Sequence, residues 1–232
     1  MAVDKLSKLR MYAEVRFSFL DSTTHMEDLE GVVKELYRTE YITKDELLLK
    51  ESEPLLGPWE MRVKPQRIFF TMDSCPSYDY FGDVLENHLK TMAKVLTPKE
   101  IINSGVQAYY LYPIDSLQDF SEVVTLWSDS YIQNKSSVVG ISDLGVNVFF
   151  KEESLKVNIN CKVLNDTQAK GYFPETGGKP VAQLNLLIDL DISTADPVEL
   201  KKSLSPALVQ ILQNQINEAV RQMEERLGNL VR

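Results

Sequence analysis

Hydrophobic and polar positions along the chain predict an alternation of strands and amphipathic helices. The longest helical pattern runs from Ser205 to Leu227, where apolar residues recur every three or four positions and Gly228 suits the C-terminal cap. A helix of this length is a rod of roughly 33 Å, which needs a broad apolar partner surface. We expect that partner to be a sheet. The apolar stripe of this helix consists of Leu208, Ile211, Leu212, Ile216, Ala219, Val220, Met223 and Leu227.

Period-two alternation predicts strands in both halves of the chain. In residues 11–20, Ala13, Val15, Phe17 and Phe19 fall on one face, and polar residues fall on the other. Further strands are predicted at 47–49, 59–64, 67–72, 106–112, 137–141, 145–150, 155–164 and 183–193. Shorter amphipathic helices are predicted at 29–36, 80–96 and 117–127, and residues 165–180 are expected to form a loop.

The order of these elements repeats at an offset of 91 residues, so that Asp28 and Leu29 fall on Asp119 and Phe120. The match is one of residue character, and any strand followed by an amphipathic helix aligns in a similar way. We expect an α+β fold of two tandem β-α-β(3-4)-α units, residues 1–100 and 101–232. Short connections between successive strands favour curved antiparallel sheets, each packed on a long helix.

This element order resembles the TATA-box-binding protein fold and the helix-grip fold of plant pathogenesis-related ligand carriers. The resemblance implies a long helix lying across a curved antiparallel sheet. The whole chain also resembles an uncharacterised, sporadically distributed bacterial family of about this length. The resemblance rests on Arg16-Phe17 in the first strand, Tyr109-Tyr110 in a mid-chain strand, and LLIDLDIS before the terminal helix. That family implies a fold and no activity.

Composition narrows the functional classes. Hydrophobic residues make up 44% and charged residues 25% of the 232 residues, as in ordinary globular proteins. The formal net charge of −9, without a cluster of Lys and Arg in the sequence, argues against nucleic-acid binding. No apolar run reaches about 18 residues, and residues 1–15 lack the apolar segment of a secretory signal. We therefore expect a cytoplasmic protein with no nucleic-acid or membrane partner.

The histidines and cysteines suggest no catalytic centre. His25 lies in a polar turn, and His88 lies on the apolar stripe of its helix, where we expect a hydrogen-bonded core side chain. Cys75 and Cys161 are far apart in sequence and have no CxxC spacing. Cys161 alternates with apolar residues, which is typical of a small core residue.

Two further patterns are candidates for a ligand site. Asp189 and Asp191 share one face of a strand and could seat a hard cation, but the alternating leucines and isoleucine make them the solvated face of that strand. The Gly177–Pro180 run (Gly-Gly-Lys-Pro) lacks the spacing of a phosphate-binding loop, and we expect a long hairpin loop there. We therefore expect no metal, no cofactor and no catalytic residues.

Two classes of function remain. In the first, the chain is a non-enzymatic interaction or assembly module that binds another protein or pairs with itself as a homo-oligomer, through strand edges or the long helix. In the alternative, it carries a small apolar ligand between the curved sheet and the C-terminal helix. The aromatic residues expected to line that space are Phe17, Phe19, Phe70, Tyr110 and Phe149.

Overall fold

The computed structural model describes residues 8–17, 31, 38–42, 46–50, 59–92, 100–114, 125, 138–142, 145–173, 183–199, 210–219 and 221. Its strands are β1 (Lys8–Phe17), β2 (Arg38–Ile42), β3 (Leu47–Lys50), β4 (Trp59–Lys64), β5 (Arg67–Met72), β6 (Glu100–Pro113), β7 (Val138–Ser142), β8 (Gly145–Glu152), β9 (Leu155–Asn165), β10 (Leu184–Thr194) and β11 (Val198–Glu199). Its helices are α2 (Tyr78–Met92), α4 (Asp166–Tyr172) and a C-terminal helix at residues 210–219. Within these ranges, no helix is long and apolar enough to cross a membrane.

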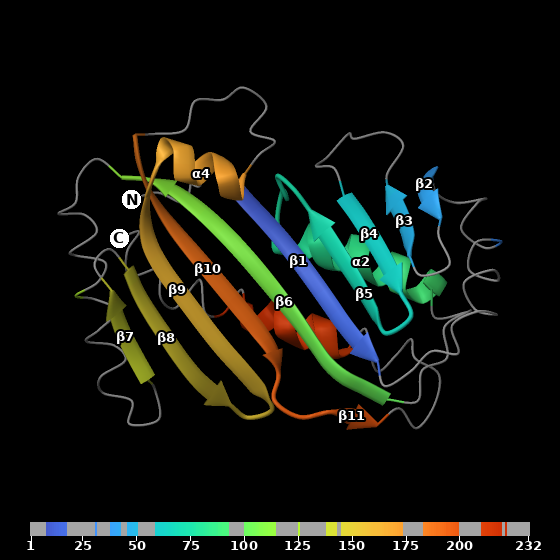
Figure 1. The fold of residues 1–232 in the computed structure, drawn as a ribbon. Helices are drawn as coiled ribbons and strands as arrows, with labels where there is room; N and C mark the ends of the chain where they lie inside the picture. The colour runs from blue at the N-terminus through green and yellow to red at the C-terminus, as the bar shows by residue number, and fades with distance from the viewer. Residues whose placement is uncertain are drawn as a thin grey trace.

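All strands join one antiparallel sheet, in the order β2-β3-β4-β5-β1-β6-β10-β9-β8-β7, with β11 pairing with one end of β6 (Figure 1). The centre of the sheet is the β1–β6 pair, which runs in register from Lys8 opposite Leu111 to Arg16 opposite Asn103. The α+β class and the antiparallel sheet are thus confirmed. Strands from both halves of the sequence meet at this pair and share a single sheet.

One face of the sheet, which we call the closed face, is buried under α2 and the C-terminal helix (Figure 1). The expected alternation is confirmed in β1, where Met11, Ala13, Val15 and Phe17 are buried in the core. The two helices approach each other at Gly82, where an added Cβ would lie 3.4 Å from the Gln213 side chain. Phe81, Leu85, Leu89 and Met92 of α2 and Leu212, Ile216 and Ala219 of the C-terminal helix complete this core.

The opposite face, which we call the open face, carries α4 at one end of β6, β9 and β10 (Figure 1). The sequence-based prediction of a loop at 165–180 is wrong for residues 166–172, which form this helix. The Asn165 side chain accepts a hydrogen bond from the backbone of Gln168, whose side chain in turn accepts one from the backbone of Asn165. This reciprocal cap stabilises a helix too short to show an amphipathic period.

Three strands differ from the prediction. β2 and β11 were not predicted, and β6 begins at Glu100 although the alternation became clear only at residue 106. Ser104 and Gly105 interrupt the alternation of apolar and polar residues, because Ser104 is a polar residue at a fully buried position. The predicted helices at 29–36 and 117–127, apart from the helical residues Gly31 and Thr125, and the C-terminal segment around Met223 and Leu227 lie outside the described residues.

Ser104 joins the C-terminal helix to the sheet through a buried polar network. Gln215 is completely buried, and its Nε2 donates to the Ser104 carbonyl oxygen at 2.8 Å and to the Ser104 Oγ at 3.1 Å. The Ser104 backbone N–H donates to Thr194 Oγ1 at 3.1 Å. Because each of these polar groups is shielded from water, the network fixes one position of the helix along the sheet.

We predict that Gln215→Leu lowers the free energy of unfolding by about 1–3 kcal/mol, because Ser104 is left buried without its partner. Urea denaturation monitored by circular dichroism measures this change. The control is Gln210→Leu on the exposed side of the same helix, expected to change stability by at most about 0.5 kcal/mol. Equal effects of the two substitutions would contradict the role of the network.

Candidate functional site

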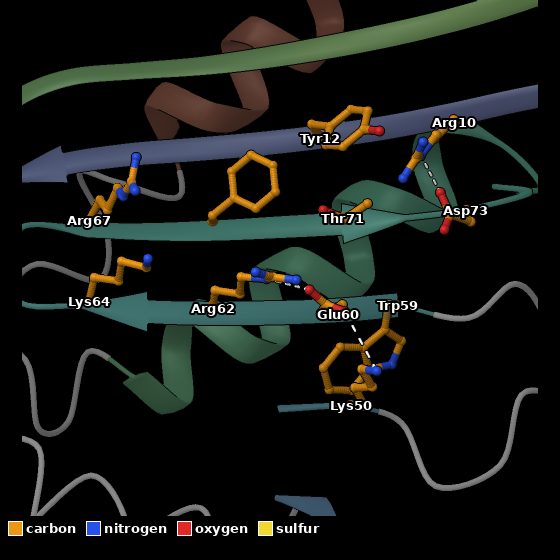
Figure 2. A pocket seen from close by; sticks show the side chains of 11 residues that line it. Arg10, Tyr12, Lys50, Trp59, Glu60, Arg62, Lys64, Arg67, Thr71 and Asp73 are labelled. Carbon is orange, nitrogen blue, oxygen red and sulfur yellow. Dashed lines mark hydrogen bonds and ion pairs between the residues drawn. The ribbon is translucent and has the colours of Figure 1, made fainter. Parts of the chain in front are cut away.

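Two adjoining grooves hollow the open face. The first, which we call the cationic groove, has a volume of about 460 Å³ and lies over β1, β3, β4 and β5 (Figure 2). The second, the central groove, has a volume of about 290 Å³ and lies over β1, β5, β6 and β10. They share Tyr12 and Phe69 as walls. The remaining lining of the cationic groove is Arg10, Lys50, Trp59, Glu60, Arg62, Lys64, Arg67, Thr71 and Asp73.

A row of three cations crosses one end of these strands. Lys64 of β4 lies directly opposite Arg67 of β5, and Arg67 lies directly opposite Arg16 of β1. Figure 2 shows the Lys64 and Arg67 side chains at the same end of their two strands. We call Lys64, Arg67 and Arg16 the cationic row. Like charges placed directly opposite one another destabilise a sheet.

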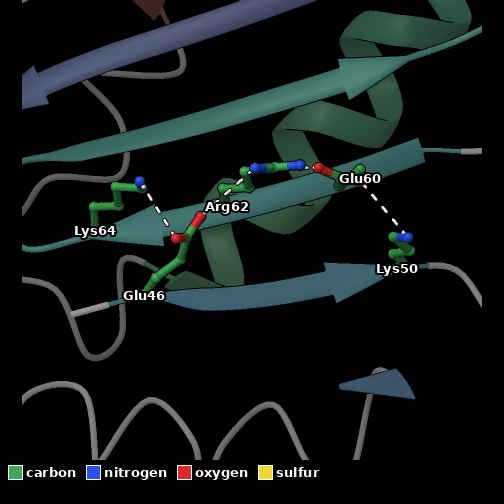
Figure 3. Close-up of polar contacts among 5 residues, drawn as sticks. All are labelled: Glu46, Lys50, Glu60, Arg62 and Lys64. Atoms are coloured by element: carbon green, nitrogen blue, oxygen red, sulfur yellow. Dashed lines mark hydrogen bonds and ion pairs between the residues drawn. The ribbon is translucent and has the colours of Figure 1, made fainter. Parts of the chain in front are cut away.

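The carboxylates around the cationic groove are shared between cations. Glu46 accepts from Lys64 at 3.3 Å and lies 3.8 Å from Arg62, which also pairs with Glu60 (Figure 3). Glu14 likewise lies between two cations of the row, 2.9 Å from Arg16 and 3.5 Å from Arg67.

Counted over the described ion pairs of this region, four carboxylates serve six cations, which leaves an excess of two positive charges. The cations are Arg10, Arg16, Lys50, Arg62, Lys64 and Arg67, and the carboxylates are Glu14, Glu46, Glu60 and Asp73. Among the described residues, this part of the surface therefore has more cations than carboxylates, in a chain whose formal net charge is −9.

Aromatic rings form the middle of the open face. The Tyr12 ring lies 5.7 Å from the Phe69 ring and 5.5 Å from the Tyr109 ring, centroid to centroid. The Arg10 guanidinium lies 4.9 Å from the centroid of Tyr12, a cation–π distance. Partial burial raises the pKa of Tyr12 above its usual value, so its hydroxyl stays protonated and can donate a hydrogen bond at neutral pH.

Asp189 and Asp191 lie on the open face, the face that the sequence predicted. They are only half exposed, however, because the neighbouring strands flank them on both sides. Gln107 Nε2 donates to Asp189 at 2.8 Å. Burial raises the pKa of Asp191 to about 6, with smaller contributions from the negative charges of Asp189 and Glu14. In the described parts of the chain, no group of three or more His, Cys, Asp or Glu is placed to hold a metal ion.

His88 lies on the closed side of the sheet, packed against two aromatic rings. Its ring centroid is 4.3 Å from that of Trp59 and 5.7 Å from that of Phe70. Burial lowers the pKa of His88 to about 4, which leaves the imidazole neutral at physiological pH. His25 and the 177–180 segment lie outside the described residues.

Both cysteines are buried, and burial raises the pKa of each thiol to about 12. Cys161 is 1% exposed within β9, as the alternation predicted, and Cys75 donates to the Ser77 carbonyl oxygen at 3.1 Å. A thiol held in this protonated state is a poor nucleophile and a poor metal ligand. Both cysteines therefore act as core side chains.

The aromatic residues expected to line a ligand cavity divide between the two faces. Phe17, Phe70 and Tyr110 are at most 2% exposed and share one core cluster with Leu212 and Ile216 of the C-terminal helix. Phe19 and Met223 lie outside the described residues.

The assignment of Phe149 to that cavity wall is wrong, because it points to the open face and is 43% exposed, whereas Phe150 is 5% exposed. Because Phe149 and Phe150 are adjacent, a strand can place either ring on its buried face, and the sequence pattern does not show which of the two it is.

The sequence pattern did not predict the cationic groove. Lys64 and Arg67 flank a two-residue connection between strands, a local signal that places them opposite each other. Arg16 joins them only through the β1–β5 pairing, which links residues about fifty positions apart and is not visible in sequence periodicity.

We predict that Asp191→Asn stabilises the protein by about 1–2 kcal/mol at pH 7.5 and has almost no effect at pH 3, which lies below both pKa values. The pKa of Asp191 is raised from 3.8 to about 6, so the folded state binds the proton more tightly than the unfolded state. The free energy of unfolding therefore falls as the pH rises from 3.8 to about 6, and an asparagine at this position removes that decrease. Urea denaturation at the two pH values measures the change in the free energy of unfolding.

The matched control is Asp196→Asn, because the Asp196 side chain is 78% exposed. Asp196 forms an exposed ion pair with Lys151 at 3.7 Å. A surface pair of this kind contributes about 0–1 kcal/mol at most. Destabilisation by Asp191→Asn at pH 7.5, or an equal gain at both pH values, would contradict burial as the cause.

No protein-family model and no curated protein sequence matches this chain. What it does must therefore be inferred from the two faces of its sheet.

Proposed function

We propose that the chain is a non-enzymatic assembly module that pairs with a second copy of itself through the β7 edge of the sheet and the adjoining part of the open face. The observation that carries this proposal is an exposed phenylalanine, Phe149, one strand in from a strand edge without charged residues. The proposed contact lies at the far end of the sheet from β2.

The two edge strands differ in character. β2 has the sequence RTEYI, with two charged residues that oppose pairing with another strand. β7 has the sequence VVGIS, with neither charge nor proline, and in the described sheet order it pairs with β8 alone. An edge of this composition is suited to accept another strand.

Phe149 supplies an apolar anchor beside that edge. It lies opposite Val138 of β7 and opposite Asn158 of β9 in the register of the sheet. Its neighbours on the open face include uncharged amides, Asn147 and Asn160, so that a partner here meets an aromatic ring surrounded by hydrogen-bonding groups. Aromatic anchors ringed by polar groups are typical of protein interfaces.

A two-fold axis perpendicular to the sheet, through paired β7 edges, would extend the sheet across the pair. It would place Phe149 of both copies on one continuous open face, with their β8 strands about 14 Å apart. Such an isologous contact closes on itself and stops at two subunits. It needs no further partner and no bound cofactor.

We also propose that the two halves are tandem copies of one β-α-β(n)-α unit. Read outward from the centre, the strand order is β1-β5-β4-β3-β2 on one side and β6-β10-β9-β8-β7 on the other. α2 follows the first set of strands in sequence, and the C-terminal helix follows the second. This matching order supports a duplicated, TATA-box-binding-protein-like arrangement, which would make β7 the counterpart of β2.

We predict that Phe149→Ser and Val138→Lys each weaken self-association by at least about tenfold, since one removes an interface anchor and the other places a charge on the edge strand directly opposite Phe149. Sedimentation velocity at micromolar to hundreds of micromolar protein measures the shift between one and two chains of 26.5 kDa.

Two substitutions serve as matched controls. Ile102→Ser removes the other large exposed apolar side chain of the described residues, which is 45% exposed on β6. Tyr41→Lys places a lysine on the opposite edge strand, β2, at the position opposite the half-buried Leu48. Both should leave association unchanged. A wild-type chain that stays at one subunit throughout the concentration range, or equal losses in the controls, would overturn the proposal.

A further inference from the structure

We propose that the cationic groove binds a phosphorylated small molecule with a planar aromatic part. The phosphate lies on the cationic row, in which Lys64 and Arg67 line the cationic groove and Arg16 lines the adjoining central groove. The planar part lies against Phe69 and Tyr12, which line both grooves. This site goes beyond the assembly function and lies on the opposite half of the open face from Phe149.

The cationic row places like charges directly opposite one another, which destabilises the strand pairs. Three cations stand directly opposite one another on adjacent strands, whereas alternating signs would stabilise the same pairs. Their carboxylates, Glu14 and Glu46, are each shared with a second cation. Local rules of this kind are typically broken at functional sites. We therefore assign the row to anion binding.

The spacing of the row suits a compact anion. Neighbouring strands lie about 4.8 Å apart, so the outer members of the row are rooted within about 10 Å of each other and their long side chains can converge. A phosphate carries its charge in that small volume, and the arginine fork matches its oxygens in a bidentate manner.

The side chains of the row can reach a ligand. Their exposed fractions are 34% for Lys64, 47% for Arg67 and 57% for Arg16. Glu14 is the carboxylate that a bound phosphate would have to replace, because it contacts both arginines of the row.

Phe69 follows Arg67 by two positions on β5, so both side chains stand on the open face. Its ring is half-buried and lies 5.7 Å from that of Tyr12, which gives a planar group two rings to lie against. The groove volume of about 460 Å³ is that of a small-molecule site. Asp191 lines the central groove together with Arg16, so in that groove a phosphate is attracted to the Arg16 side and repelled by Asp191.

The test uses isothermal titration calorimetry of the full chain with two probes, adenosine 5′-monophosphate and flavin mononucleotide. Adenosine and riboflavin test the planar part alone, and inorganic phosphate tests the phosphate alone. We expect at least one nucleotide to bind at least about tenfold more tightly than its unphosphorylated form and than inorganic phosphate. Failure of both nucleotides to bind, or phosphate binding as tightly as either, would overturn the proposal.

Two substitutions with opposite expected effects locate the site. Arg67→Gln should weaken nucleotide binding by at least about tenfold, because it removes a charge-assisted contact to phosphate. Glu14→Gln should strengthen it severalfold, because it removes the competing carboxylate. The opposite signs separate a binding effect from a loss of folding, which would weaken binding in both variants.

The matched control is Lys90→Gln on α2, where the lysine pairs with Glu86 away from the groove. It should leave binding unchanged. Weakening by Lys90→Gln equal to that by Arg67→Gln, or an unchanged affinity in both groove variants, would show that the nucleotides bind elsewhere. Phe149→Ser should also leave the affinity unchanged, so failure of the assembly proposal does not affect this test.

Discussion

Burial of the closed face under α2 and the C-terminal helix is the constraint on which the rest of the structure depends. A strand places successive side chains on opposite faces, so committing Met11, Ala13 and Val15 to the core commits Tyr12 and Glu14 to the other side. Buried and open-face side chains alternate in the same way in the strands from β3 to β8 of the sheet order. The open face is therefore a direct consequence of the core, and its charges and rings are held by a buried scaffold.

The antiparallel register then converts that face into distinct surfaces. Pairing of β4, β5 and β1 brings Lys64, Arg67 and Arg16 into one row, while pairing of β6, β10 and β9 gathers Gln107, Asp191 and Asn158. The cationic end, the aromatic middle and the polar region beside Phe149 lie along one sheet. The proposed assembly contact and the proposed ligand site thus lie on separate parts of the same face and share no side chain.

Sequence periodicity was sufficient for the strands and helices that have one apolar face. It placed β1, β4, β5, β9 and β10 and the buried side of α2, because these obey a simple period. It failed where polar residues are buried or apolar ones exposed. Gln215 and Ser104 are inside because they satisfy each other, and Phe149 is outside although Phe150 beside it is inside. The cationic row depends on long-range register, which no local pattern encodes.

Hydroxyl-radical footprinting of the dilute protein, with oxidation resolved at single residues by mass spectrometry, tests the two-faced sheet most directly. Two pairs of adjacent phenylalanines provide internal standards, Phe149 beside Phe150 and Phe69 beside Phe70. Phe149 is 43% exposed and Phe150 is 5% exposed, while Phe70 is fully buried next to a half-buried Phe69. The account predicts severalfold faster oxidation of the first member of each pair. Equal or reversed rates within the pairs would contradict it.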